Sequence, residues 1–82
     1  MRIDKYLKVS RIIKRRTVAS DACNAGRVMV NDRKVKPSYD VKVGDIIEIS
    51  FGQRKLGVEV LDIAETTKKD AAEGLYKVIK DE

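Results

Sequence analysis

The chain has 82 residues, which is enough for one small domain and leaves no room for a separate catalytic domain. Hydrophobic residues make up 43% of it, which argues against a disordered chain, and no apolar run has the length of a membrane span or of a secretion signal. The single cysteine, Cys23, cannot form an internal disulfide, which favours a cytoplasmic protein.

Positive charge is concentrated in the first half of the chain. Residues 1–36 contain eleven basic and three acidic side chains, a net charge of +8, whereas residues 37–82 contain seven basic and ten acidic side chains, a net charge of −3. A chain of this kind can turn one face toward a polyanion and keep the other face soluble. The clustering and the arginine content favour a nucleic acid partner over an ordinary solvated surface.

Two helices are predicted at the N-terminus. In residues 3–9, Ile3, Tyr6 and Leu7 have helical spacing, and Asp4 falls in the first turn, where a carboxylate favours the positive end of the helix dipole. After this helix, residues 12–13 are two isoleucines that form a short apolar anchor in the connection.

The second helix is predicted to run from about Arg16 to Ala25. Its stripe of small and apolar residues is expected to face the core, and Gly26 is expected to cap its C-terminal end because glycine accepts a left-handed conformation. The stripe consists of Val18, Ala19, Ala22 and Cys23.

The rest of the chain is predicted to be mostly β-structure. Asn31 and Asp32 favour a tight hairpin between two short strands, and a strand over residues 46–51 follows a turn at residues 44–45. Another strand is expected within residues 55–63. Residues 64–74 are predicted to be a loop or a short helical turn, and residues 75–80 a last strand rather than a terminal helix. The expected class is α+β, with the helices first and a small antiparallel sheet after them.

The chemistry of an enzyme is missing from the sequence. Histidine is absent, and one cysteine cannot build a zinc site. Cys23 is most simply a small buried side chain. Arg27, which is near it in the sequence, is expected to lower the pKa of the Cys23 thiol slightly at most. No nucleophile with an adjacent base and no glycine-rich phosphate loop is present. We therefore expect neither catalysis, nor a cofactor, nor a metal.

The basic residues before the second helix are the most informative feature. Arg15 and Arg16 stand where the free N–H groups and the dipole of a helix already favour an anion, and cations at this place oppose the dipole. The guanidinium fork fits two phosphate oxygens at once. Alternatively, one arginine pairs with Asp4 and braces the two helices, and different arginines can fill both roles.

Residues 2–49 contain a spaced series of basic, apolar and turn residues that includes Arg2, Asp4, Arg16, Gly26 and Asp45. With this series they resemble the S-four domain, an RNA-binding domain named after a protein of the small ribosomal subunit. The resemblance implies an alpha-L fold, with two or three N-terminal helices packed on a small antiparallel sheet, and an RNA-contacting surface on the helices and the first hairpin. It divides the chain into an S-four domain at residues 1–50 and an extension at residues 51–82 that completes the same domain. The matching positions are Arg2, Asp4, Leu7, Arg11, Arg16, Ala19, Gly26, Val28, Val30, Asn31, Val35, Pro37, Ser38, Val43, Gly44 and Asp45.

The likeness is stronger to the stand-alone bacterial S-four proteins of ribosome-associated quality control, and it extends through "FGQRKLGVEV" and "TTKKDAA" to "YKVIK". This resemblance implies a cytoplasmic, ribosome-associated monomer. Its partners would be rRNA of the large ribosomal subunit, peptidyl-tRNA and the alanine-tailing factor of the pathway, and its role would be to support C-terminal alanine tailing. Many S-four domains have a serine before the helix arginines and another arginine after them, whereas Arg15 and Thr17 stand here.

The family also implies which side chains touch RNA. Asp4 is expected to position a basic side chain, because its charge repels phosphate, and Lys68 and Lys69 are weaker candidates. The expected RNA-binding residues are Arg2, Lys8, Arg11, Lys14, Arg15, Arg16, Thr17, Arg27, Arg33 and Lys34.

Three other functions remain open. S-four domains are appended to pseudouridine synthases, tyrosyl-tRNA synthetases and some methyltransferases, but the ending "YKVIKDE" is expected to be that of a whole chain rather than a detached piece. A protein-interaction module would use the acidic second half. A generic rRNA-binding protein, or a heat-shock protein that binds large subunits carrying a nascent chain, is the alternative within the RNA-binding class.

Overall fold

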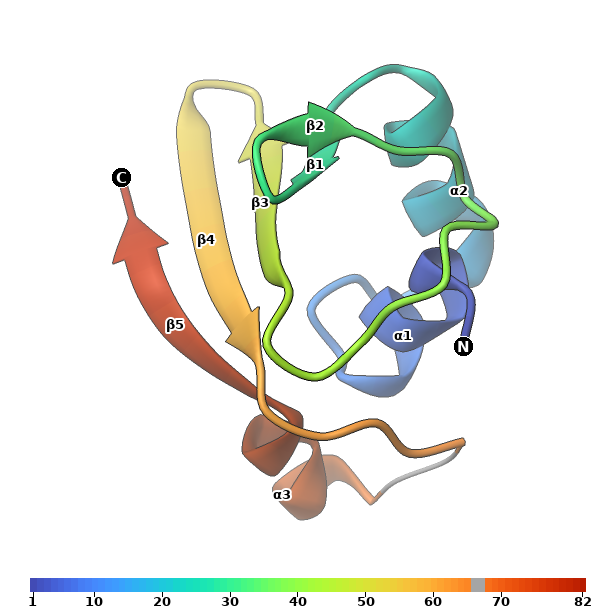
Figure 1. The fold of residues 1–82 in the computed structure, drawn as a ribbon, viewed down its shortest axis with the longest axis vertical. Helices are drawn as coiled ribbons and strands as arrows, with labels where there is room; N and C mark the ends of the chain where they lie inside the picture. The colour runs from blue at the N-terminus through green and yellow to red at the C-terminus, as the bar shows by residue number, and fades with distance from the viewer. Residues whose placement is uncertain (66–67) are drawn as a thin grey trace.

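The computed structural model describes residues 1–65 and 68–82. The five strands form one antiparallel sheet in the order β2-β1-β3-β4-β5, and α1 and α2 lie together on one side of it (Figure 1). This arrangement confirms the predicted α+β class. The elements are α1 (Ile3–Val9), α2 (Arg16–Asn24), β1 (Val28–Val30), β2 (Arg33–Lys34), β3 (Ile46–Phe51), β4 (Arg54–Val60), α3 (Lys69–Ala72), the 3-10 turn η1 (Glu73–Leu75) and β5 (Tyr76–Asp81).

The core lies between the two helices and one face of the sheet. Successive strand residues point to opposite faces, so the register that pairs Ile47 with Val58 and Ile49 with Val28 places all four on the same face. These side chains are fully buried, as are the predicted helix residues Ile3, Tyr6 and Leu7. Burial of this continuous apolar face is the main stabilising contribution to a domain of this size.

The helix α2 ends as predicted, but its core-facing stripe is narrower than predicted. Gly26 has a φ of +74°, and the N–H groups of Gly26 and Arg27 donate to the carbonyls of Cys23 and Ala22, which is a Schellman cap. Ala19 and Cys23 are buried. Val18, however, is 51% exposed, so its assignment to the core was wrong. The i, i+4 pair Ala19 and Cys23 defines the packed face, and Val18 lies 100° around the helix from it.

The hairpin between β1 and β2 has the predicted turn. Asn31 and Asp32 both have positive φ, 51° and 68°, as a type I′ turn requires. Asn31 also attaches the turn to β3, because its backbone N–H donates to the Ile46 carbonyl at 2.9 Å and its side-chain oxygen accepts from the Ile46 N–H at 3.1 Å.

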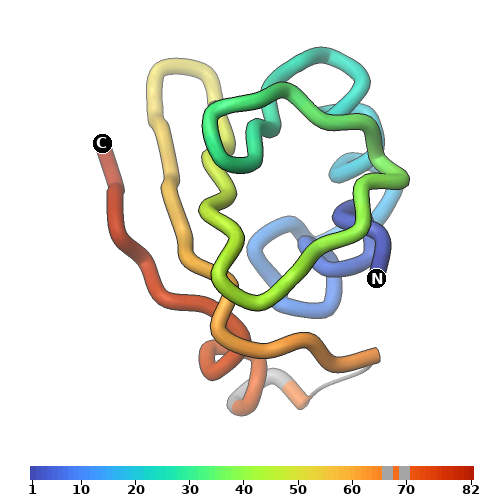
Figure 2. Tube along the Cα trace, viewed as in Figure 1, coloured from blue at the N-terminus to red at the C-terminus, as the bar shows by residue number. Residues whose placement is uncertain are grey.

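The long segment between β2 and β3 connects the sheet to the N-terminus (Figure 2). The Ile3 N–H donates to the Tyr39 carbonyl, and the Val41 N–H donates to the Met1 carbonyl, both at 2.8 Å. At the end of the segment, the buried carboxylate of Asp45 accepts hydrogen bonds from the Tyr39 hydroxyl at 2.9 Å and the Lys42 N–H at 3.0 Å, and from the Asn31 amide at 3.2 Å.

Residues after position 50 continue the same sheet and return to α1. The strand β5 confirms the predicted last strand, and α3 with η1 gives residues 69–75 a short helical form. The strand β4 ends at Val60, and Leu61 is 45% exposed. The buried Tyr6 hydroxyl donates to the Leu75 carbonyl at 2.7 Å, and Lys5 forms an ion pair with Glu65. Both contacts attach the C-terminal segment to α1.

We expect the hydrogen bonds of Asp45 to contribute measurably to stability. Asp45→Ala leaves three donors without their acceptor and should lower the free energy of unfolding by about 2 kcal/mol, whereas Tyr39→Phe, which removes one donor, should cost about 1 kcal/mol. Urea unfolding of both variants measures the two values. Equal stability of Asp45→Ala and the parent chain would contradict this role.

Candidate RNA-binding surface

A buried carboxylate organises the basic residues at the start of the two helices. The Asp4 side chain is only 4% exposed, and its Oδ1 accepts from the Lys5 backbone N–H at 2.7 Å. Arg2 donates to it twice, from Nε to Oδ1 at 3.3 Å and from an Nη to Oδ2 at 3.2 Å. Nε of Arg16 lies 3.4 Å from Oδ1. One carboxylate of α1 therefore holds the arginine before α1 and the first residue of α2.

The two arginines keep donors available for a ligand. The side chain of Arg2 is 52% exposed and that of Arg16 is 45% exposed. A guanidinium has five N–H donors, so a contact of one or two of them with Asp4 leaves the others for solvent or phosphate. Bracing by Asp4 and binding of an anion are therefore compatible roles of the same arginine.

The N-cap residue of α2 provides no side-chain cap. Arg15 occupies the N-cap position with extended backbone, makes no side-chain hydrogen bond to the helix, and is followed by a first turn without an acidic residue. Lys14, Arg15 and Thr17 are exposed beside it. Free N–H groups, the helix dipole and the cationic side chains together make this end of α2 strongly electropositive.

A tight connection brings α2 next to α1. Arg11 has a φ of +63°, a left-handed conformation that is uncommon for a residue other than glycine, and its N–H donates to the Lys8 carbonyl at 3.0 Å. Ile13 is buried at 5% exposure and confirms the predicted apolar anchor, while Ile12 is partly buried. Lys8 and Arg11 stay exposed on the outside of the connection.

The hairpin residues form a second basic group at the other end of α2. Arg27, Arg33 and Lys34 follow the helix or lie on the hairpin, and the stem of Lys34 covers Gly26, where an added Cβ would be 3.3 Å from its Cδ. A helix of nine residues separates this end from the Asp4 contacts by about 13 Å. The predicted residues are thus distributed over two groups rather than gathered at one point.

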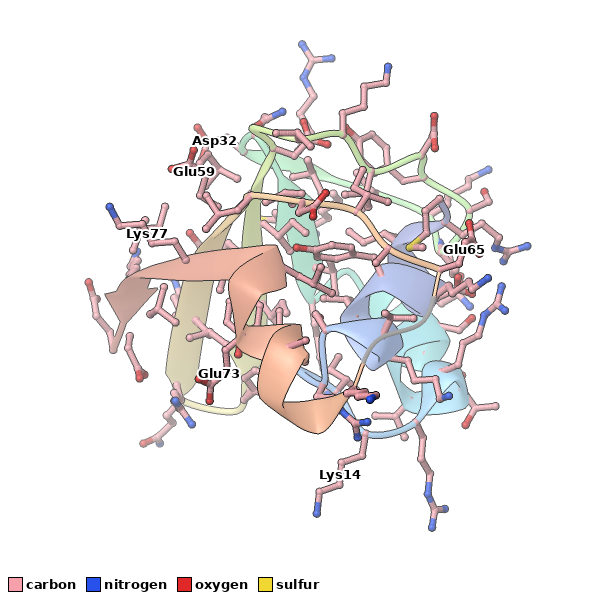
Figure 3. The ribbon with its side chains drawn as sticks, turned by 90° about the horizontal axis from the view of Figure 1, so that it is seen from below. Lys14, Asp32, Glu59, Glu65, Glu73 and Lys77 are labelled. Carbon is pink, nitrogen blue, oxygen red and sulfur yellow. The ribbon has the colours of Figure 1, made fainter. Side chains whose placement is uncertain are left out.

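Most of these cations form no ion pair with a carboxylate of the described residues. In residues 1–65 and 68–82, no ion pair involves Lys8, Arg11, Lys14, Arg15, Arg27, Arg33 or Lys34. Figure 3 shows Lys14 projecting from the connection into solvent, away from Lys77 on β5.

The weaker candidates in the C-terminal half are Lys68 and Lys69, and Arg54, which the sequence did not single out, differs from the pattern of unpaired cations. The Arg54 guanidinium donates two hydrogen bonds, of 2.8 and 3.0 Å, to the Asp81 carboxylate. Lys68 is exposed, and the side chain of Lys69 lies outside the part that the structure describes.

Cys23 has the environment of a packing residue. It is 4% exposed, and burial, together with the nearby Asp4 charge, raises the pKa of its thiol to about 11. The buried position confirms the predicted small packing side chain, and desolvation outweighs any lowering of the thiol pKa by Arg27. Across the described residues, no three potential ligand side chains gather into a metal site, and no helix is long and apolar enough to cross a membrane.

The thiol of Cys23 should therefore react slowly. With a pKa of about 11, roughly one thiol in a thousand is ionised at pH 8, and burial restricts access further. Alkylation by iodoacetamide should be at least tenfold slower in the native chain than in the chain unfolded in urea. Equal rates in the two states would contradict this assignment.

The fold and sequence both match known proteins. A model of the S4 domain matches residues 1–47. The chain is 53% identical over 81 residues to the "RQC P-site tRNA stabilizing factor" of Streptococcus pneumoniae, covering 99% of this chain and 92% of the relative. The Bacillus subtilis protein of the same name is 46% identical over 82 residues, covering 100% of this chain and 95% of the relative.

Solved structures show the same fold. The trimeric structure of Vibrio cholerae Heat Shock Protein 15 superposes with a TM-score of 0.89 at 28% identity, covering 95% of this chain and 80% of that one. The solution structure of the hypothetical protein HP1423 gives a TM-score of 0.83 at 31% identity and covers both chains fully. The chain belongs to the S4 domain family and, within it, to the family of the bacterial RQC P-site tRNA stabilizing factors.

Proposed function

We propose that this chain is an RNA-binding factor of ribosome quality control, which binds ribosomal RNA through the surface around Asp4. The observation that carries the proposal is the buried carboxylate that holds Arg2 and Arg16 side by side at the uncapped start of α2. Phosphate oxygens are the natural ligands of such an arrangement, because a guanidinium fork fits two phosphate oxygens at once and a helix N-terminus also favours an anion.

The distribution of charge supports a single RNA-binding face. Seven cations that form no ion pair within the described residues lie on α1, the α1–α2 connection and the hairpin region, whereas several carboxylates of the second half are already engaged by cations of that half. Long-range attraction to a polyanion is therefore directed toward the helical side of the molecule. The role is one of binding without catalysis, which is consistent with a protonated, buried Cys23 and the absence of histidine from the chain.

The names of the relatives support a more specific partner. A protein that is 53% identical over 99% of this chain is called an RQC P-site tRNA stabilizing factor. We propose that this chain also binds large ribosomal subunits that retain a peptidyl-tRNA, in the cytoplasm, as a monomer when free. There it would hold the tRNA while the alanine-tailing factor extends the stalled nascent chain. Its RNA contacts would come from the two basic groups, with Asp4 as a positioning residue.

The salt dependence of binding should identify the residues that contact phosphate. Arg16→Ala should weaken binding to purified large-subunit RNA and reduce the slope of log K against log salt by about one unit, because one phosphate contact is lost. Lys77→Ala is the matched control, since it removes one exposed cation from β5 and should change both quantities much less. An equal loss for Lys77→Ala would contradict the position of the proposed surface.

The ribosomal particle that is recognised is a separate test. Phosphate contacts give affinity with little sequence discrimination, so selectivity must come from the shape of a composite surface. We expect the chain to co-sediment most strongly with large subunits that carry peptidyl-tRNA, less with empty large subunits and least with intact ribosomes. Sedimentation with each purified particle measures this order. Indifference to the tRNA would favour a generic rRNA-binding protein or a heat-shock type of large-subunit factor.

A further inference from the structure

A groove next to α2 is lined mostly by residues outside the predicted surface. It has a volume of about 310 Å³ and is lined by Val18 and Ala22 of α2, by the buried anchor Ile13, and by Phe51 at the end of β3. The exposed position of Val18 is explained here, because its side chain forms a wall of this groove and does not enter the core.

Phe51 connects this groove to a second hollow. A hollow of about 370 Å³ lies between the α1–α2 connection and the sheet, and Phe51 lines it together with Arg11, Leu56 and Tyr76. Phe51 is 39% exposed, which is unusual for an aromatic side chain on the core-facing side of a sheet. The ring is therefore accessible between two depressions.

An arginine stands on each side of Phe51. Arg11 lines the second hollow, and Arg27 lines the groove. The position of Arg27 is fixed by the backbone, because the N–H of Ser50, next to Phe51, donates to the Arg27 carbonyl at 2.9 Å. Neither guanidinium forms an ion pair within the described residues.

We propose that Phe51 and its two flanking arginines bind one unpaired nucleotide of RNA, with the base stacked on the ring and its flanking phosphates paired with Arg11 and Arg27. The inference rests on the proposed function and adds a second, base-binding site to it. Every nucleotide in a strand has a phosphate on both sides of its base, which matches an aromatic platform between two cations. An apolar protein segment would leave both guanidinium groups without partners.

The Asp21 carboxylate is the group in the groove that can distinguish one base from another. It lines the same groove, and its side chain makes no hydrogen bond or ion pair with another described residue. A carboxylate repels phosphate but accepts hydrogen bonds from amino and imino groups on the edge of a base. Guanine offers two such donors side by side, whereas uracil offers only one. The groove should therefore prefer guanine to uracil.

Binding of the full chain to two RNA hairpins tests the proposal. One hairpin carries a single bulged guanine and the other is fully paired. The parent chain should bind the bulged hairpin about tenfold more tightly, as expected for one stacked base. Phe51→Leu should abolish this preference and leave binding to the paired hairpin unchanged, whereas Phe51→Tyr, which keeps the ring, should retain it. Val43→Ala is a control for loss of an exposed apolar side chain elsewhere, since Val43 is 62% exposed.

Two further readouts make the result specific. A bulged 2-aminopurine should lose fluorescence on binding to the parent chain and not to Phe51→Leu, because stacking quenches it. Asp21→Asn should reduce the preference for a bulged guanine over a bulged uracil at least threefold. Thermal unfolding of each variant checks that the fold is intact.

The outcomes separate this site from the proposed function. Equal binding of both hairpins by the parent chain, or an unchanged preference in Phe51→Leu, would overturn the base-binding site and leave the phosphate-binding surface in place. Failure to bind either hairpin or ribosomal RNA would overturn both. A change of oligomeric state in Phe51→Leu, measured by light scattering, would assign the groove to self-association instead.

Discussion

The carboxylate of Asp4 is the group on which the geometry of the helical face depends. A charge that is almost excluded from solvent must be compensated, and here the compensation comes from Arg2, Arg16 and the Lys5 N–H. The same contacts set the distance between the start of α1 and the start of α2. The basic residues beside them are therefore presented by a fixed framework, and two long, flexible side chains are ordered before any ligand arrives. Preorganisation of this kind reduces the entropy that binding would otherwise cost.

The C-terminal half keeps that framework in place. The segment from β2 to β3 hydrogen-bonds to Met1 and Ile3, the residues on both sides of Arg2. At the end of this segment, the Asp45 carboxylate accepts three hydrogen bonds that fix its conformation. The Tyr6 hydroxyl also attaches α1 to Leu75, the last residue before β5. A domain of 82 residues buries a limited core, so such specific polar contacts make a larger relative contribution to its rigidity. The sheet and its connections thus hold the two helices in the orientation that presents the basic residues to a ligand.

Local signals in the sequence predicted most of the fold. Two of these signals depend only on local backbone conformation, namely the turn at Asn31 and Asp32 and the helix cap at Gly26. Such a turn or cap can therefore be predicted from a few consecutive residues. Val18 was misassigned because helical periodicity shows which residues share a face but not how far the sheet extends beneath that face. Charge clustering indicated the basic surface, and the idea of an arginine braced by Asp4 followed from sequence. The division into two groups and the accessible ring of Phe51 depend on tertiary packing, which no local pattern encodes.

The central claim is that Asp4 acts on RNA binding through Arg16, and a double-mutant cycle measures this coupling directly. Affinity for large-subunit RNA is determined for the parent chain, Asp4→Asn, Arg16→Ala and the double variant, with thermal unfolding as a check of the fold. We predict that Asp4→Asn weakens binding about tenfold although it removes a negative charge, and that its effect is smaller once Arg16 is gone, because only Arg2 then remains for Asp4 to position. Tighter binding of Asp4→Asn, or independent and additive effects of the two substitutions, would contradict the account.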